Sequence, residues 1–100
     1  MSSTSGFGPH VQNSINNTMK MLNEFRFAEA CVFLFHLNKW HPSEWSYVVN
    51  QVLLNVPTNK FSMAATIVQC SSRSDLSSCN VLIPGLSEYT HLPTNPDFYE

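Results

Sequence analysis

The chain carries few charged residues. Charged side chains make up 12% of its 100 residues, with five Lys and Arg against seven Asp and Glu, and the formal net charge is -2. Globular proteins average about 25% charged residues. A chain without a positive excess lacks the electrostatic footprint of a non-specific nucleic-acid binder, and it lacks the polybasic segment of a membrane-surface protein. We therefore expect neither a DNA partner nor a membrane partner.

Long apolar runs and targeting signals are also missing. No apolar run approaches the ~20 residues that span a bilayer. The first nine residues are small and polar, and they show neither the charged region nor the apolar region of a secretory signal. These features predict an intracellular, cytoplasmic protein in which residues 1–9 form a disordered leader.

Cysteine is scarce and its spacing is irregular. The three cysteines are Cys31, Cys70 and Cys79, and no CxxC pair occurs. An odd count without paired spacing does not indicate a disulfide framework, and a structural zinc site needs four ligands in close pairs. The sequence therefore predicts three free thiols, with Cys31 buried, and it predicts no metal and no cofactor.

Apolar residues, which make up 43% of the chain, recur with a helical period. In the first periodic segment Val11, Ile15, Met19 and Leu22 lie on one stripe of a 3.6-residue repeat. The second segment is apolar nearly all round, which is typical of a helix enclosed by its neighbours. The segments that we predict to be helical are 10–23, 26–39, 43–55 and 60–70.

Prolines mark two of the predicted boundaries. Pro42 fits the first turn of the third helix, and Ser43 could act as its N-cap one position later. Pro57 ends the third helix. We expect Thr58 or Asn59 to cap the fourth.

The last third of the chain lacks a periodic apolar pattern. Residues 71–80 are rich in Ser and predict a loop. Residues 81–100 contain three of the six prolines, and Gly85 follows the first of them, so they predict an extended tail. The chain then divides into a leader (1–9), two helical hairpins (10–70) and a loop with a tail (71–100). If the tail packed on the helices instead, its anchors would be Val81, Leu82, Ile83 and Leu86.

A shift of 34 residues superimposes the two halves of the helical region. Phe27 then falls on Phe61 and Ala30 falls on Ala64, and hydrophobic class is kept at almost every core position. Small residues at the Ala positions would let paired helices approach closely, and the two Phe side chains would be buried at the entrance of each hairpin. The alternative is that any two amphipathic hairpins of similar length align this well.

A period of 34 residues resembles the tetratricopeptide family and the neighbouring 35-residue pentatricopeptide family. Residues 24–42 are similar to the second helix and exit of such a repeat, with Ala30 as the small residue, Leu34 as the large apolar residue and Pro42 at the exit. Residues 46–50 resemble the opening of a pentatricopeptide first helix. The resemblance implies an all-α fold of antiparallel helical hairpins stacked as a short α-solenoid fragment, acting as a protein–protein interaction scaffold within a larger protein. Its partners would be another protein or adjoining repeats.

The pentatricopeptide resemblance also implies an alternative function, RNA binding. The positions that match base-reading residues are Glu44 and Val49, and a valine side chain cannot hydrogen-bond to a base. Phosphate contacts need Lys or Arg, and only four occur in the helical region. These are Lys20, Arg26, Lys39 and Lys60. RNA therefore stays the second alternative.

Two stacked hairpins are too few to bury both faces of a solenoid, so exposed aromatic residues are expected. The candidate interaction surface is Phe33, Phe35, Trp40 and Trp45, which are aromatic and have few charged neighbours. The alternative is that all four pack inside the protein.

Other candidate sites are weak. No catalytic sequence motif occurs, and His36 lies among apolar residues, so we expect a packed histidine and a protein that is not an enzyme. In the tail, Asn95, Pro96 and Phe98 resemble the turn peptides that phosphotyrosine-binding-type domains recognise.

Overall fold

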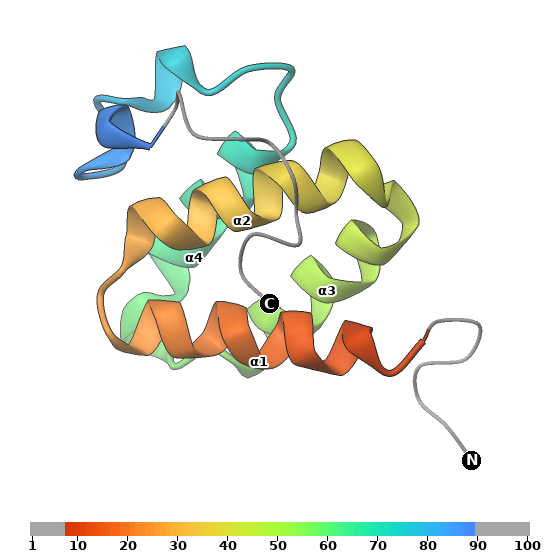
Figure 1. Ribbon diagram of the computed structural model, residues 1–100. Coiled ribbons are helices and arrows are strands. Elements are labelled where there is room, and N and C mark those ends of the chain that lie inside the picture. Colours follow the sequence, from red (N-terminus) through yellow and green to blue (C-terminus); the bar gives the residue numbers. More distant parts are fainter. Residues whose placement is uncertain (1–7, 90–100) are drawn as a thin grey trace.

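The computed structural model describes residues 8–89, which form a bundle of four α-helices (Figure 1). The helices are α1 (His10–Asn23), α2 (Phe27–Trp40), α3 (Pro42–Asn55) and α4 (Thr58–Ser71), followed by the short 3-10 helices η1 (Ser77–Cys79) and η2 (Leu86–Glu88). Residues 8–89 contain no strand. The predicted all-α class is confirmed, and each helix begins and ends within two residues of the predicted position.

Prolines, and not side-chain caps, mark the starts of α3 and α4. Pro42 is the first residue of α3, as predicted. The expected caps Ser43, Thr58 and Asn59 are wrong, because the N-cap positions belong to His41 and to Pro57 and neither makes a side-chain cap bond. Proline fixes φ near the helical value, so it can start a helix where no capping side chain is present.

Helix α2 lies at the centre of the protein. It packs against α1, α3, α4 and η2, and its residues are buried without a break from Ala30 to Leu37. This enclosure explains why its sequence has no polar face. No helix of residues 8–89 has both the length and the apolar composition to cross a membrane.

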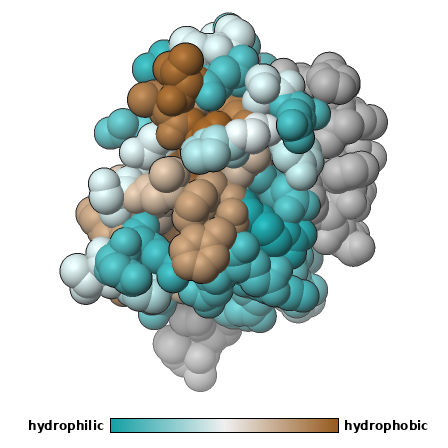
Figure 2. All heavy atoms as spheres, turned by 90° about the vertical axis from the view of Figure 1, so that its left-hand side faces the viewer, coloured by the Kyte–Doolittle hydropathy of each residue, from teal (hydrophilic) through white to brown (hydrophobic). Residues whose placement is uncertain are grey.

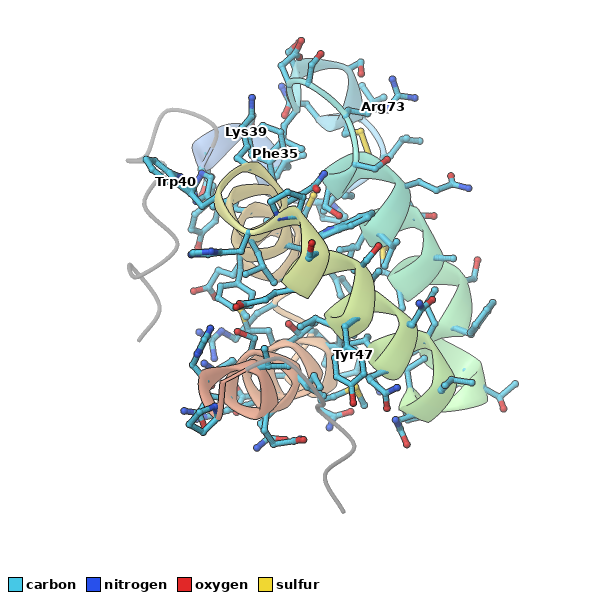
Figure 3. All side chains as sticks on the ribbon, turned by 90° about the vertical axis from the view of Figure 1, so that its right-hand side faces the viewer. Phe35, Lys39, Trp40, Tyr47 and Arg73 are labelled. Atoms are coloured by element: carbon cyan, nitrogen blue, oxygen red, sulfur yellow. A yellow bond between two sulfur atoms is a disulfide. The ribbon has the colours of Figure 1, made fainter. Side chains whose placement is uncertain are left out.

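Helix α1 packs against α3, and α2 packs against α4. His10 Nε2 at the start of α1 lies 2.8 Å from Glu44 Oε2 at the start of α3, and Asn38 Nδ2 near the end of α2 donates to the Ser71 carbonyl at the end of α4 over 3.2 Å. In Figure 3 α1 and α2 lie on the left and α4 forms the right-hand edge of the helices. These two pairs of neighbouring residues are separated in the chain by 34 and by 33 positions.

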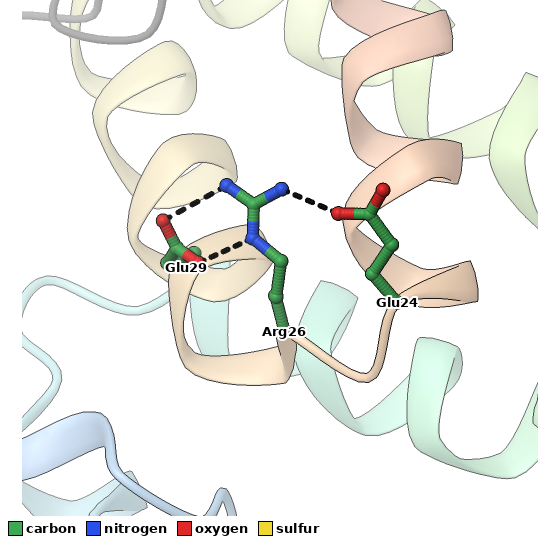
Figure 4. Close-up of polar contacts among 3 residues, drawn as sticks. All are labelled: Glu24, Arg26 and Glu29. Atoms are coloured by element: carbon green, nitrogen blue, oxygen red, sulfur yellow. Dashed lines mark hydrogen bonds and ion pairs between the residues drawn. The ribbon is translucent and has the colours of Figure 1, made fainter.

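The connection between α1 and α2 is fixed by a three-residue polar cluster (Figure 4). Arg26 donates from Nε to Glu29 Oε1 over 2.5 Å and from Nη2 to Glu29 Oε2 over 3.1 Å, and its Nη1 donates to Glu24 Oε1 over 2.7 Å. The hydrogen bonds from Arg26 lower the pKa of Glu29. Glu29 lies in the first turn of α2, where a negative charge also favours the helix dipole.

A disulfide between Cys70 and Cys79 closes the segment that follows α4. The prediction of three free thiols is therefore wrong for these two residues, while Cys31 is free and buried as predicted. The nine-residue separation of the pair matches no disulfide motif, and the bond forms because the chain turns back immediately after α4. Figure 3 shows the sulfur–sulfur bond beside the segment that carries Arg73.

Residues 72–89 fold back on the helices, so the extended tail predicted for 81–100 is wrong over residues 81–89. Leu76, just before η1, and Cys79, the last residue of η1, are buried. Ile83 and Leu86 are fully buried. Of the four anchors named for a packed tail, Ile83 and Leu86 contribute to the core, while Val81 and Leu82 are exposed. Two inward apolar side chains three positions apart fit short 3-10 turns, a signal too brief to be recognised in the sequence.

Candidate interaction surface

The structure divides the predicted aromatic surface into buried and accessible halves. Phe33 and Phe35 are only 3% and 8% exposed, so the expectation that they lie on the surface is wrong. Both lie on α2, and α2 is enclosed on every side by the other helices and the folded-back tail. Between Ala30 and Leu37, a side chain of α2 is therefore buried whichever way it points.

The two tryptophans differ from each other. Trp40, at the end of α2, is 57% exposed and extends away from the ribbon in Figure 3. Trp45 is half-buried on α3, and its Nε1 donates to Ser71 Oγ over 3.0 Å. Because two of the four predicted residues are in the core, the set does not form one exposed surface.

A different apolar row is accessible on α4. Phe61, Ala65 and Val68 follow an i, i+4, i+7 spacing and form the α4 stripe. Phe61 is 47% exposed, and the other two are partly buried. The stripe lies roughly 100° around the helix from the buried Ala64 and Ile67, so it borders the contact of α4 with α2.

The counterparts of the α4 stripe on α2 are covered. The corresponding residues, 34 positions earlier, are Phe27, Cys31 and Leu34. Phe27 is partly buried and the other two are fully buried. The next position of that row is Asn38, which bonds to α4, so the row faces α4. The predicted burial of Phe61 as an equivalent of Phe27 is wrong, because no helix of the described region covers α4 in the way that α4 covers α2.

Exposed apolar residues also gather near the helix connections. Phe25, in the connection between α1 and α2, is 69% exposed and has a left-handed φ of 60°. Its ring makes an edge contact with Phe27 at a centroid distance of 5.9 Å, and Lys60 Nζ lies 4.8 Å from its centroid. Figure 2 shows hydrophobic atoms on this side of the molecule, and the exposed Val81 and Leu82 belong to the segment between η1 and η2. Phe25 is not among the predicted surface residues. The signal in the sequence is its position, because it is an aromatic residue in the short segment between two predicted helices.

Charge is almost absent from the second hairpin. Between Pro42 and Ser71 the only charged residues are Glu44 and Lys60. Glu44 pairs with His10, and Lys60 lies over the Phe25 ring. The α4 stripe is therefore bordered by neutral polar side chains, which favours an apolar contact over an electrostatic one.

The residues considered for RNA binding do not form a basic surface. Val49 is buried, so it cannot contact a base. Arg26 is occupied by two carboxylates, and Lys39 Nζ lies 5.2 Å from the centroid of Phe35. Within residues 8–89, no group of three His, Cys, Asp or Glu side chains is placed to hold a metal ion.

Several predicted features lie outside the described residues. These are most of the leader, residues 1–7, and the tail motif of Asn95, Pro96 and Phe98.

Neither a protein-family model nor a curated protein or solved structure matches this chain. The function of these surfaces therefore has to be inferred from their geometry and chemistry.

Proposed function

We propose that the protein is a non-enzymatic protein-interaction scaffold built from two stacked helical hairpins. The register of the hairpins supports stacking. His10 meets Glu44, Asn38 meets Ser71, and Phe25 meets Lys60, one position beyond its 34-residue equivalent. These contacts join the starts of α1 and α3, the ends of α2 and α4, and the α1–α2 connection with the first turn of α4. Each pair of residues is about one repeat apart in the chain, as expected for tetratricopeptide-like units.

The observation that carries the proposal is the exposure of the α4 stripe. In a stack, each hairpin covers the preceding one, and the last hairpin leaves its outer row open. Phe61 is 47% exposed, whereas its counterpart on α2, Phe27, is partly buried against the core and contacts Phe25 of the connection. The fitting partner is therefore a helix or hairpin with an apolar face and little charge, supplied by another protein or by an adjoining repeat.

The disulfide bears on where such a scaffold acts. Disulfides persist in oxidising compartments and are rare in the cytosol. The bond between Cys70 and Cys79 therefore disfavours the cytoplasmic location expected from the sequence. The test is to quench the protein with acid at extraction from its native source, alkylate it in denaturant and count the labelled cysteines by mass spectrometry. One labelled cysteine indicates an oxidising compartment, and three indicate the cytosol.

Site-directed crosslinking tests the scaffold. A photo-reactive amino acid replaces Ala65 in the α4 stripe, or Lys20, an exposed residue of α1, in a matched control. We expect position 65 to capture a defined protein, position 20 not to capture it, and the purified partner to bind the Phe61→Asp variant at least about tenfold more weakly. A product of twice the chain mass would identify the partner as a second copy. Equal products at both positions, or none at position 65, would contradict the proposal.

A further inference from the structure

Helix α1 carries an acceptor motif for N-linked carbohydrate. Asn16, Asn17 and Thr18 match the pattern in which a residue other than proline separates an asparagine from a Ser or Thr. The chain has ten asparagines, and Asn16 is the one that has a Ser or Thr two positions later. An N-linked glycan on this chain would therefore be attached at Asn16.

The fold places Asn16 on the outward face of α1. The buried side chains of this helix include Val11, Ile15 and Leu22, whereas Asn16 is exposed. Five residues along an α-helix correspond to a rotation of roughly 140°, so Asn16 lies far around the helix from Val11. Helix α1 packs against α2 and α3 and forms the lower edge of the helices in Figure 1. A sugar at Asn16 would extend into solvent, on a different helix from the α4 stripe.

The hydrogen bonding of Asn16 is compatible with an attached sugar. Gln12 Nε2, one turn earlier in α1, donates to Asn16 Oδ1 over 3.1 Å. A sugar is attached to Nδ2, and the carbonyl oxygen stays an acceptor. The glycosylated side chain can therefore keep this bond, and α1 can form around it.

Thr18 determines when the sugar can be added. Its side chain is fully buried, and its hydroxyl donates to the Ser14 carbonyl over 2.8 Å. Because the hydroxyl residue belongs to the motif that the transferase recognises, folded α1 conceals part of that motif. Sugar transfer therefore has to precede the folding of α1.

The disulfide is a second observation, independent of the motif. The bond between Cys70 and Cys79 indicates an oxidising compartment, and the secretory pathway is both oxidising and the place where N-linked sugars are added. We propose that Asn16 is N-glycosylated before α1 folds, an inference that rests on the oxidising location proposed above.

The donor for this reaction is an oligosaccharide linked to a polyprenyl pyrophosphate. Asn16 Nδ2 forms a bond to C1 of the first sugar, and the bond from C1 to the pyrophosphate oxygen breaks. The polyprenyl pyrophosphate leaves, and one amide proton passes to a base of the transferase.

Enzymatic deglycosylation of protein from its native source tests the proposal. Peptide N-glycosidase in heavy-oxygen water converts a glycosylated asparagine to a labelled aspartate, and we expect fragment mass spectra to locate the label at residue 16. Unlabelled Asn16 in protein with one alkylatable cysteine would overturn the glycan and keep the disulfide. Unlabelled Asn16 with three alkylatable cysteines would overturn the glycan and the oxidising location together.

Matched variants locate the acceptor. The full chain, with a cleavable secretory signal fused ahead of Met1, is translated in the presence of microsomal membranes. We expect a mass increase of one glycan, its complete loss in Asn16→Gln, and its retention in Thr18→Ser and in Asn13→Gln, an exposed control on α1 outside the motif. Transfer acts on the unfolded chain, so the result does not depend on whether each variant folds. A wild-type chain without the increase, or an Asn16→Gln chain that keeps it, would refute the site.

Discussion

Trp45 Nε1 donates a hydrogen bond to Ser71 Oγ over 3.0 Å, which ties the start of α3 to the end of α4. Ser71 is fully buried, and its hydroxyl donates in turn to the Val68 carbonyl over 2.8 Å. Its own carbonyl accepts from Asn38 of α2. One small residue thus joins three helices at the end of the bundle that bears the disulfide.

The Trp45–Ser71 bond predicts an energetic coupling. Trp45→Phe and Ser71→Ala should each lower the free energy of unfolding by about 1 kcal/mol or more, the usual net value of a hydrogen bond. Urea denaturation of the single and double variants should give a coupling of at least about 0.5 kcal/mol. Ser72→Ala, an exposed neighbour, is the control and should change little. Strictly additive losses would show that the bond does not form in solution.

The burial of Phe33 and the exposure of Phe61 predict opposite roles. Phe33→Ala should cost roughly 3–5 kcal/mol, the range for a buried Phe, and should unfold much of the protein. Phe61→Ala should cost less than about 1 kcal/mol, because nearly half of its side chain is exposed, and it should reduce self-association. Thermal melts and sedimentation measure both effects. A larger loss from Phe61→Ala than from Phe33→Ala would mean that the α4 stripe is covered.

The disulfide predicts a measurable loss on reduction. A sequence separation of nine residues corresponds to about 2.5 kcal/mol of loop-closure entropy in the unfolded chain. The Cys70→Ala/Cys79→Ala variant and the wild type in excess phosphine should both be destabilised by about this amount. The phosphine should not affect the variant further. An unchanged melting temperature in both would mean that the bond is absent in solution.

Cys31 provides an internal check on the thiol count. Burial raises the pKa of its thiol to about 12, so almost no thiolate is present at pH 8. Alkylation of the folded, oxidised protein should therefore be slow and should become fast only in denaturant. Rapid labelling of the native protein would show that α2 is accessible at Cys31.

His36 predicts a dependence of stability on pH. The pKa of His36 lies below 6.5, its ordinary value, because of burial and the nearby Lys39. Between the two values the unfolded chain binds more protons than the folded chain, so stability should fall as the pH falls below about 6.5 and level off below the folded pKa. Asp75 lines the same surface pocket as His36, and hydrogen bonds from Ser77 lower the pKa of its carboxyl, so it stays ionised over this window. His36→Phe should remove this slope, while the His10→Gln control should keep it.

The two carboxylates on Arg26 predict unequal losses. Glu29 accepts two hydrogen bonds from the guanidinium and is less exposed than Glu24, which accepts one. Glu29→Gln should therefore lower the melting temperature more than Glu24→Gln does. Because Arg26 lowers the pKa of Glu29, the difference between the variants should shrink as the pH falls below 4.5, the ordinary value. An equal effect of both variants would argue against the bidentate pair.

The features that depend on local chemistry could be predicted from the chain. The four helices, the start at Pro42, the end of α3 before Pro57 and the all-round apolar character of α2 follow from the spacing of apolar residues and from the restrictions that proline places on the backbone. These constraints act over one or two helical turns, so a sequence contains them directly.

The features that depend on which segments lie together could not be predicted. The pairing of Cys70 with Cys79 and the return of Ile83 onto the helices require the chain to reverse after α4, and no short-range pattern records that reversal. Phe33 and Phe61 are both aromatic residues of a helical stripe, yet one is in the core and the other is accessible. Burial is a property of neighbours brought together from distant parts of the chain, so it is settled only when the helices have packed.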